Sequence, residues 1–133
     1  MQFNSGSFAG TFSASSGQIY ITNTTLNGPS ISIGDNSGQN PSSDISIYGS
    51  TINALQGSGP AGGAQLEING QSNTAGSAGV GISSSTITTD NAYIGIDGTG
   101  FLQSGYDSTG VLINNSTITV GSASAPGALG WPS

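Results

Sequence analysis

One short pattern occurs four times in the 133-residue chain and constrains its fold more than any other feature. Each copy begins with two aliphatic residues separated by one position, and a third aliphatic residue follows five positions after the second. The copies are Ile19/Ile21/Leu26, Ile45/Ile47/Ile52, Val80/Ile82/Ile87 and Val111/Ile113/Ile118. A Thr precedes the third aliphatic residue in every copy, at Thr25, Thr51, Thr86 and Thr117. Such agreement indicates a repeat architecture in which each unit stacks on the next.

The spacing inside each copy predicts a strand, a bend and a second strand. The first two aliphatic side chains are two residues apart, so they point to one face of a strand. The third follows at an odd spacing, so a bend is needed to return it to the same core. We expect the bend at Asn23, Gly49, Ser84 and Asn115. Asn and Gly accept the left-handed conformation of a tight bend, and Ser84 is the weakest match.

A third strand is expected after three of the copies, at Ile31/Ile33, Leu66/Ile68 and Ile94/Ile96. The copies start at residues 19, 45, 80 and 111, and the length variation falls in Gly-, Ser-, Asn- and Pro-rich stretches such as 57–63 and 98–107. Loops absorb such insertions cheaply. No segment has a helical period. The pattern predicts an all-β fold, a parallel β-solenoid (β-helix) of about four coils with irregular Gly/Ser/Asn-rich loops, because coils must stack residue for residue. An antiparallel sandwich is the competing fold, but it does not require the same bend and the same Thr in every unit.

The repeats divide the chain into three parts. Residues 17–121 hold the solenoid repeats, residues 1–16 are expected to form an N-terminal cap or docking segment, and residues 122–133 a C-terminal cap or tail. An uncovered end of a solenoid exposes unpaired strand edges. The residues suited to cover the two ends are Phe3, Phe8 and Phe12 at one end and Leu129, Trp131 and Pro132 at the other. Two alternatives remain open: the tails are frayed, or one end docks a neighbouring subunit and builds a filament.

The composition excludes several classes of partner. The chain has no Lys, Arg, His or Cys, and six acidic residues give it a formal net charge of −6. Without cations it has no means to neutralise phosphates, so we expect no nucleic-acid binding, and anionic lipid surfaces would repel it. No disulfide is possible, and no apolar run is long enough to span a membrane. The absence of trypsin sites suits an extracellular or cell-surface location.

The same composition argues against an enzyme. Proton transfer and nucleophilic attack usually require His, Lys or Cys, which are absent. Two carboxylates can serve a glycosidase, and the candidates are Asp97 and Asp107, expected in the loop after a core strand, together with Asp35 and Glu67. Their spacing does not repeat, so we interpret them as solvated loop residues and turn formers. Residues 95–100 are rich in Gly but lack the repeated acids of a calcium-binding β-roll. We expect no catalytic residue, cofactor or metal site.

The outward positions of the second strand form the most distinctive surface. If the third aliphatic residue of each copy points inward, its two neighbours point outward. These neighbours are the pairs Thr25/Asn27, Thr51/Asn53, Thr86/Thr88 and Thr117/Thr119. Stacking would align them in two columns that resemble the flat Thr-x-Thr faces of β-solenoid ice-binding proteins. The simpler interpretation, which we favour, is that Thr is a good outward strand residue and that stacked Thr side chains support one another.

Two stretches also resemble a known family. Residues 17–27 (Gly-Gln-Ile-Tyr-Ile-Thr-Asn-Thr-Thr-Leu-Asn) and 110–120 (Gly-Val-Leu-Ile-Asn-Asn-Ser-Thr-Ile-Thr-Val) are similar to the β-helical repeats of filamentous-haemagglutinin-like secreted adhesins and related right-handed β-helix surface proteins. The resemblance covers about residues 17 to 121. It implies an extracellular rod that adheres or builds a surface layer.

Three functions are therefore considered. The first is a non-catalytic structural or adhesive β-solenoid that associates with itself end to end as a surface filament subunit, with a glycan or another surface ligand as a second candidate partner. The second is an ice-binding protein that uses the Thr and Asn columns. The third is a carbohydrate-binding β-helix.

Overall fold

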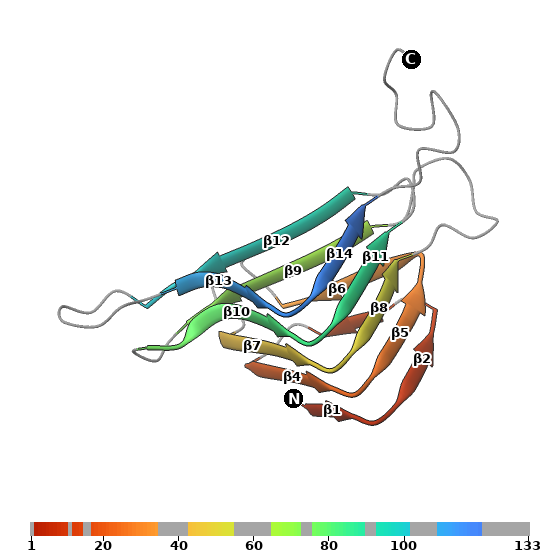
Figure 1. Ribbon diagram of the computed structural model, residues 1–133, viewed down its shortest axis with the longest axis horizontal. Helices are drawn as coiled ribbons and strands as arrows, with labels where there is room; N and C mark the ends of the chain where they lie inside the picture. Colours follow the sequence, from red (N-terminus) through yellow and green to blue (C-terminus); the bar gives the residue numbers. More distant parts are fainter. Residues whose placement is uncertain are drawn as a thin grey trace, which may run out of the picture.

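The computed structural model describes residues 2–10, 12–14, 17–34, 43–54, 65–72, 76–89, 93–101 and 109–120. These residues form fourteen β-strands and contain no helix. Every pairing between the described strands is parallel, which excludes the antiparallel sandwich. The protein is all-β with stacked parallel sheets (Figure 1).

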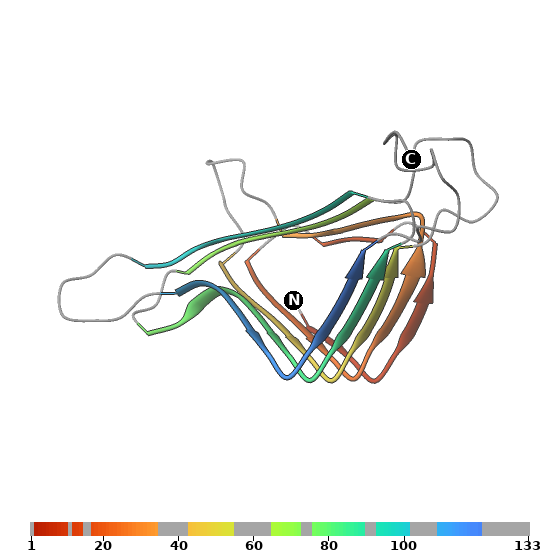
Figure 2. The ribbon, with the colours of Figure 1, turned by 45° about the horizontal axis from the view of Figure 1, so that its top comes forward.

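The strands lie on three faces that the chain visits in a fixed order. The first face contains β1 (Gln2–Asn4), β4 (Gln18–Thr22), β7 (Ser43–Tyr48), β10 (Ala78–Ser83) and β13 (Thr109–Asn114). The second contains β2 (Ser7–Ala9), β5 (Thr25–Gly28), β8 (Thr51–Ala54), β11 (Thr86–Thr89) and β14 (Thr117–Val120). The third contains β3 (Phe12–Ala14), β6 (Ser30–Ile33), β9 (Gln65–Gln71) and β12 (Tyr93–Thr99). The first and second faces meet as a V and the third crosses above them (Figure 2). Each pass around the faces is called a rung below.

Apolar side chains at the same position of successive rungs stack in columns inside these faces. On the first face the register aligns Phe3, Ile21, Ile47, Ile82 and Ile113. On the second face it aligns Phe8, Leu26, Ile52, Ile87 and Ile118. The Ile and Leu residues of the middle rungs are buried. Each such burial contributes about 1.5–3 kcal/mol, so the columns supply the main stabilisation of the stack.

A left-handed residue forms the bend between the first and second faces in every rung. Asn23, Gly49, Ser84 and Asn115 have φ values of 49°, 60°, 50° and 49°. In the middle rungs this residue donates its backbone N–H to a carbonyl oxygen of the following rung, as in the bond from Asn23 N to Tyr48 O at 2.9 Å. The bend therefore also helps to set the register between rungs.

The residue after each bend carries a hydroxyl group that links neighbouring rungs. These residues are Thr24, Ser50, Ser85 and Ser116, of which the first three are buried. The backbone N–H groups of Thr24, Ser50 and Ser85 each donate to the Oγ of the next rung's hydroxyl residue, all at 3.1 Å. Each hydroxyl in turn donates to a backbone carbonyl oxygen two residues earlier. This ladder satisfies polar groups that would otherwise be costly inside the corner.

In the segment where a cap or docking segment was expected, residues 2–10 and 12–14 form an additional rung. The stack thus has five rungs among the described residues, where the four copies of the pattern predict about four. Phe3 and Phe8 are aligned with Ile21 and Leu26, and Ser5 takes the bend position with φ 57°. Phenylalanine replaces the aliphatic residues in this rung, which is why the pattern did not reveal it. The cap or tail expected in residues 122–133 lies outside the described residues.

Candidate functional site

The second face carries the two predicted columns of polar side chains, which we call the Thr/Asn ladder. One column aligns Thr25, Thr51, Thr86 and Thr117, and the other aligns Asn27, Asn53, Thr88 and Thr119. Strands of one sheet lie about 4.7–4.9 Å apart, so hydroxyl and amide groups recur at that interval. The row of strands that carries the ladder is seen in Figures 1 and 2.

Burial along the strands follows the alternation that the sequence implies. Leu26, Ile52 and Ile87 are buried, and their ladder neighbours are half-buried or exposed. Within the ladder, Asn53 Nδ2 donates to Asn27 Oδ1 at 2.7 Å. The ladder is thus an ordered polar surface. Ser7 and Ala9 of the first rung are aligned with the two columns, but the Ala9 side chain is not polar.

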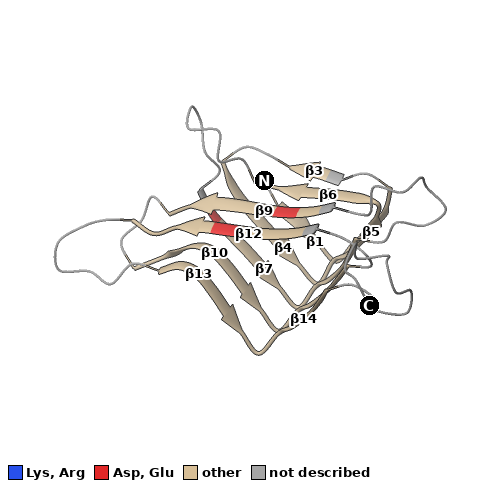
Figure 3. Ribbon diagram, turned by 90° about the horizontal axis from the view of Figure 1, so that it is seen from above, with Lys and Arg blue, Asp and Glu red and all other residues tan. Residues whose placement is uncertain are grey.

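Of the four acidic residues considered from the sequence, the structure describes Glu67 and Asp97. Asp35 and Asp107 lie outside the described residues. Asp97 lies within β12, not in a loop, because β12 pairs with β9 along seven residues from Tyr93 to Thr99. Glu67 and Asp97 are exposed and lie on neighbouring strands of the third face (Figure 3). The register places Glu67 opposite Gly95 and Asp97 opposite Asn69, so the two carboxylates are offset diagonally on an open sheet.

The Gly-rich stretch that was weighed as a calcium loop is also part of β12. Residues 95–99 are extended and paired with residues 67–71, so they do not wrap around an ion. Within the described part of the chain, no three His, Cys, Asp or Glu residues gather where they could hold a metal ion. The described residues likewise include no helix of the length and apolar character needed to cross a membrane.

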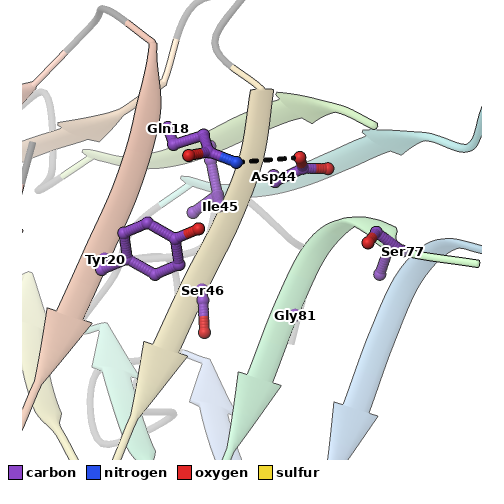
Figure 4. Close-up of a pocket in the computed structure, with 8 residues that line it drawn as sticks. Gln18, Tyr20, Asp44, Ile45, Ser46, Ser77 and Gly81 are labelled. Carbon is purple, nitrogen blue, oxygen red and sulfur yellow. Dashed lines mark hydrogen bonds between the residues drawn. The ribbon is translucent and has the colours of Figure 1, made fainter. Parts of the chain in front are cut away.

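A hollow on the outer side of the first face was not foreseen from the sequence. It has a volume of about 360 Å³ and is lined by Gln18, Tyr20, Asp44, Ile45, Ser46, Ser77, Ala78 and Gly81. Gln18 Nε2 donates to Asp44 Oδ2 at 3.3 Å across β4 and β7 (Figure 4). The hollow arises where strands separate, so no spacing in the sequence could have revealed it. We call it the Tyr20 hollow.

No protein-family model, curated protein or solved structure matches this chain.

Proposed function

We propose that the chain is a β-solenoid with a non-catalytic structural or adhesive role at the cell surface, and that it extends by end-to-end stacking of copies. The observation that carries the proposal is that the described rungs end in apolar strand edges at both ends of the stack. An open end of parallel strands is a template for pairing with another chain.

The carboxyl-terminal end of the described stack exposes residues that hold core positions. Ile113 is 45% exposed, whereas its aligned neighbour Ile82 is 0% exposed. Val120 is 52% exposed, although it is aligned with the buried Thr89. Because no described rung covers β13 and β14, a further rung would bury these side chains as the inner rungs do.

The amino-terminal end offers a complementary surface. A hollow of about 310 Å³ is lined there by residues of the first two rungs, among them Phe3, Phe8 and Leu26. Phe8 is 43% exposed although it holds a core position. The aliphatic side chains of one end therefore have an aromatic hollow to fill at the other end of a second copy.

Backbone hydrogen bonds give this stacking a direction. In the inner rungs the bend residue donates its N–H to the following rung, while the first residue of the second face donates its N–H to the preceding rung. Among the described residues, Asn115 N has no following rung to donate to, and Asn4 O has no preceding rung from which to accept. Head-to-tail stacking would pair Asn115 N with Asn4 O of the next copy. Such a heterologous contact continues as a filament unless its rotation closes a ring.

Charge affects the stacking through the whole molecule. Strands β1, β2, β13 and β14 contain no acidic residue, so the contact itself brings no like charges together. Each copy nevertheless carries a net charge of −6, and copies repel at long range. Raising the ionic strength from about 0.01 M to 0.15 M shortens the screening length from about 30 Å to about 8 Å. Assembly should therefore increase with salt.

Negative-stain microscopy and light scattering at low and high protein concentration test the proposal. Wild-type protein should form filaments in 0.15 M salt, and either Phe8→Asp or Ile113→Asp should abolish them by placing a charge in the contact. Leu112→Asp is the matched control, because Leu112 is 51% exposed and lies on the outer side of β13. A mixture of the two blocked variants should form dimers and nothing longer, since each retains one functional end. A monodisperse wild-type monomer at high concentration and high salt would contradict the proposal.

Ice binding is the second candidate function, and the observation that favours it is the regular alignment of the Thr/Asn ladder. Thermal hysteresis and ice-crystal shaping measure it directly. Thr86→Tyr should abolish the activity by raising a bulky ring in the middle of the ladder. Ser32→Tyr on the third face is the matched control and should have no effect. Unchanged hysteresis in Thr86→Tyr would exclude the ladder as the ice-binding surface.

A further inference from the structure

The Tyr20 hollow exists because β7 and β10 separate at their starts. Pairing of β10 with β7 begins only at Val80 and Ile45. Before that point Ser43 of β7 is paired with Gln71 of β9, on the third face. β7 and β10 are therefore unpaired with each other before this point, and side chains line an opening there (Figure 4).

Asp44 is placed in this opening by a bulge. The register of β4 and β7 pairs Gln18 with Ser43 and Ile19 with Ile45, so Asp44 is an extra residue in β7. Its φ of 49° is left-handed, which is uncommon for a residue other than glycine. A bulge changes the direction in which a side chain points. Strained backbone conformations are also frequent where a side chain has a binding role. In the Tyr20 hollow the bulge brings the Asp44 carboxylate beside the Gln18 amide.

The lining combines one aromatic ring with several small polar groups. Tyr20 is 39% exposed and lies on the outer side of β4, and the register aligns it with Ser46 and Gly81. The small side chains of these neighbours leave the space beside the ring open. Ser77 lies on the far side, near the start of β10 (Figure 4). A ligand in the hollow would therefore meet an apolar ring on one side and hydrogen-bonding groups around it.

These groups select a class of ligand. The carboxylate accepts hydrogen bonds, the amide both donates and accepts, and the serine hydroxyls do both. Anions are disfavoured because the chain has no Lys or Arg. A calcium ion requires six to eight oxygen ligands, and no cluster of three acidic residues occurs in the described residues. With anions and calcium set aside, the aromatic ring and the hydrogen-bonding groups of the hollow fit a neutral ring that has several hydroxyl groups on its rim and an apolar C–H face.

We propose that the Tyr20 hollow binds a neutral pyranose unit of a glycan. The C–H face of the sugar packs on the Tyr20 ring, and its hydroxyls bond to Asp44, Gln18, Ser46 and Ser77. The volume of about 360 Å³ lies near the lower end of the 300–1,000 Å³ typical of ligand sites, which suits one sugar ring. This inference deepens the adhesive part of the proposed function by naming a ligand class. It is independent of filament formation, because the hollow is lined by residues of β4, β7, β10 and the preceding Ser77 of a single copy.

Calorimetric titration of the protein at low salt and low concentration, with ligand-observed NMR, tests the proposal. The probes are methyl β-D-glucopyranoside, methyl β-D-galactopyranoside, N-acetylglucosamine and cellopentaose, with tetramethylammonium chloride as the cationic comparison. At least one sugar should bind saturably at one site per chain, and tetramethylammonium should not compete with it.

Two substitutions should weaken sugar binding while the fold is retained. Tyr20→Ala removes the ring, and Asp44→Asn removes the charge while keeping a residue type that tolerates the left-handed conformation. Each should reduce affinity about tenfold or more, the effect expected from loss of a hydrogen bond to a charged group or of a stacking contact. Tyr48→Ala and Asp97→Asn are the matched controls and should change affinity less than about twofold, because neither residue lines the Tyr20 hollow. Thermal unfolding of each variant verifies that it is folded.

Three results would overturn the proposal: no sugar binds saturably, tetramethylammonium displaces the sugar, or Tyr48→Ala weakens binding as much as Tyr20→Ala does. Filament formation by a protein that binds none of the sugars would leave the structural role standing and remove the ligand. Sugar binding by a protein that stays monomeric would support the ligand and contradict filament formation.

Discussion

The hydroxyl ladder at the corner allows a quantitative prediction about Ser50. Ser50 is 2% exposed, and its Oγ accepts the backbone N–H of Thr24 at 3.1 Å. The same hydroxyl donates to Tyr48 O at 2.9 Å and has a longer contact with Ile21 O at 3.3 Å. Ser50→Ala removes all three of these interactions, because the Ala side chain has no polar group.

The cost follows from which groups lose their last partner. Tyr48 O also accepts the N–H of Asn23 at 2.9 Å, so it remains satisfied after the substitution. Thr24 N has no other acceptor, and Thr24 is buried. One buried donor without a partner costs about 1–3 kcal/mol, so we expect Ser50→Ala to lower the free energy of unfolding by about 2 kcal/mol. For a chain of this length this corresponds to a fall of roughly 6–10 °C in Tm.

The position of the hydroxyl in the stack provides the control. Ser116 makes the equivalents of two of these bonds: its Oγ accepts Ser85 N–H at 3.1 Å and donates to Asn114 O at 2.9 Å. It is only half-buried in the last described rung. Water can replace the lost hydroxyl there, so Ser116→Ala should cost less than about 1 kcal/mol. Ser50→Thr should be far milder than Ser50→Ala, because Thr24 already fills the equivalent position of the preceding rung.

Urea unfolding monitored by circular dichroism, at protein concentrations too low for assembly, measures these differences. Equal losses in Ser50→Ala and Ser116→Ala would refute the reasoning, because they would mean that burial of the orphaned N–H does not determine the cost. A loss below about 0.5 kcal/mol in Ser50→Ala would show that the ladder bonds add little net stability.

Three further predictions concern the core, the close contacts and the bend. Ile47→Ala should cost about 2–5 kcal/mol of unfolding free energy because Ile47 is fully buried, whereas Ile113→Ala in the monomer should cost much less; similar urea midpoints for the two would contradict the column packing. Gly28→Ala should be severely destabilising in thermal unfolding, since its Cβ would collide with the carbonyl oxygen of Gly10, while Gly81→Ala should be nearly neutral because its Cβ would lie 3.8 Å from Ile45 O. Ser84→Asn should raise the unfolding free energy by about 0.5–1 kcal/mol, because Asn adopts φ near 50° more readily than Ser does; a lower Tm would count against a strained bend.

Much of the architecture could be predicted because the sequence repeats at the positions that stack. The aliphatic triplets such as Ile45/Ile47/Ile52 occupy aligned core columns, and the residues expected at the bends have positive φ. The first rung was missed because Phe3 and Phe8 do not belong to the aliphatic pattern, although they keep its five-residue spacing. That spacing, with Ser5 between them, was the signal that could have revealed the rung.

Of the two candidate sites, one could be predicted from the sequence and the other could not. The Thr/Asn ladder was predictable because strand alternation determines which side chains of a strand share a face. The Tyr20 hollow was not, because it depends on Ser43 pairing with Gln71 on another face while β10 joins β7 only at Val80. The extended conformation of Asp97 was likewise decided by pairing between β9 and β12.

The sequence by itself determined which residues face the core, where the chain bends and that the strands are parallel, because a repeated unit that buries one face must stack on copies of itself. Only the tertiary structure decided where neighbouring strands separate and which core residues are left exposed at the ends of the described stack. Those features depend on pairings between distant segments and on loops of unequal length, and the local pattern of side chains carries no record of them.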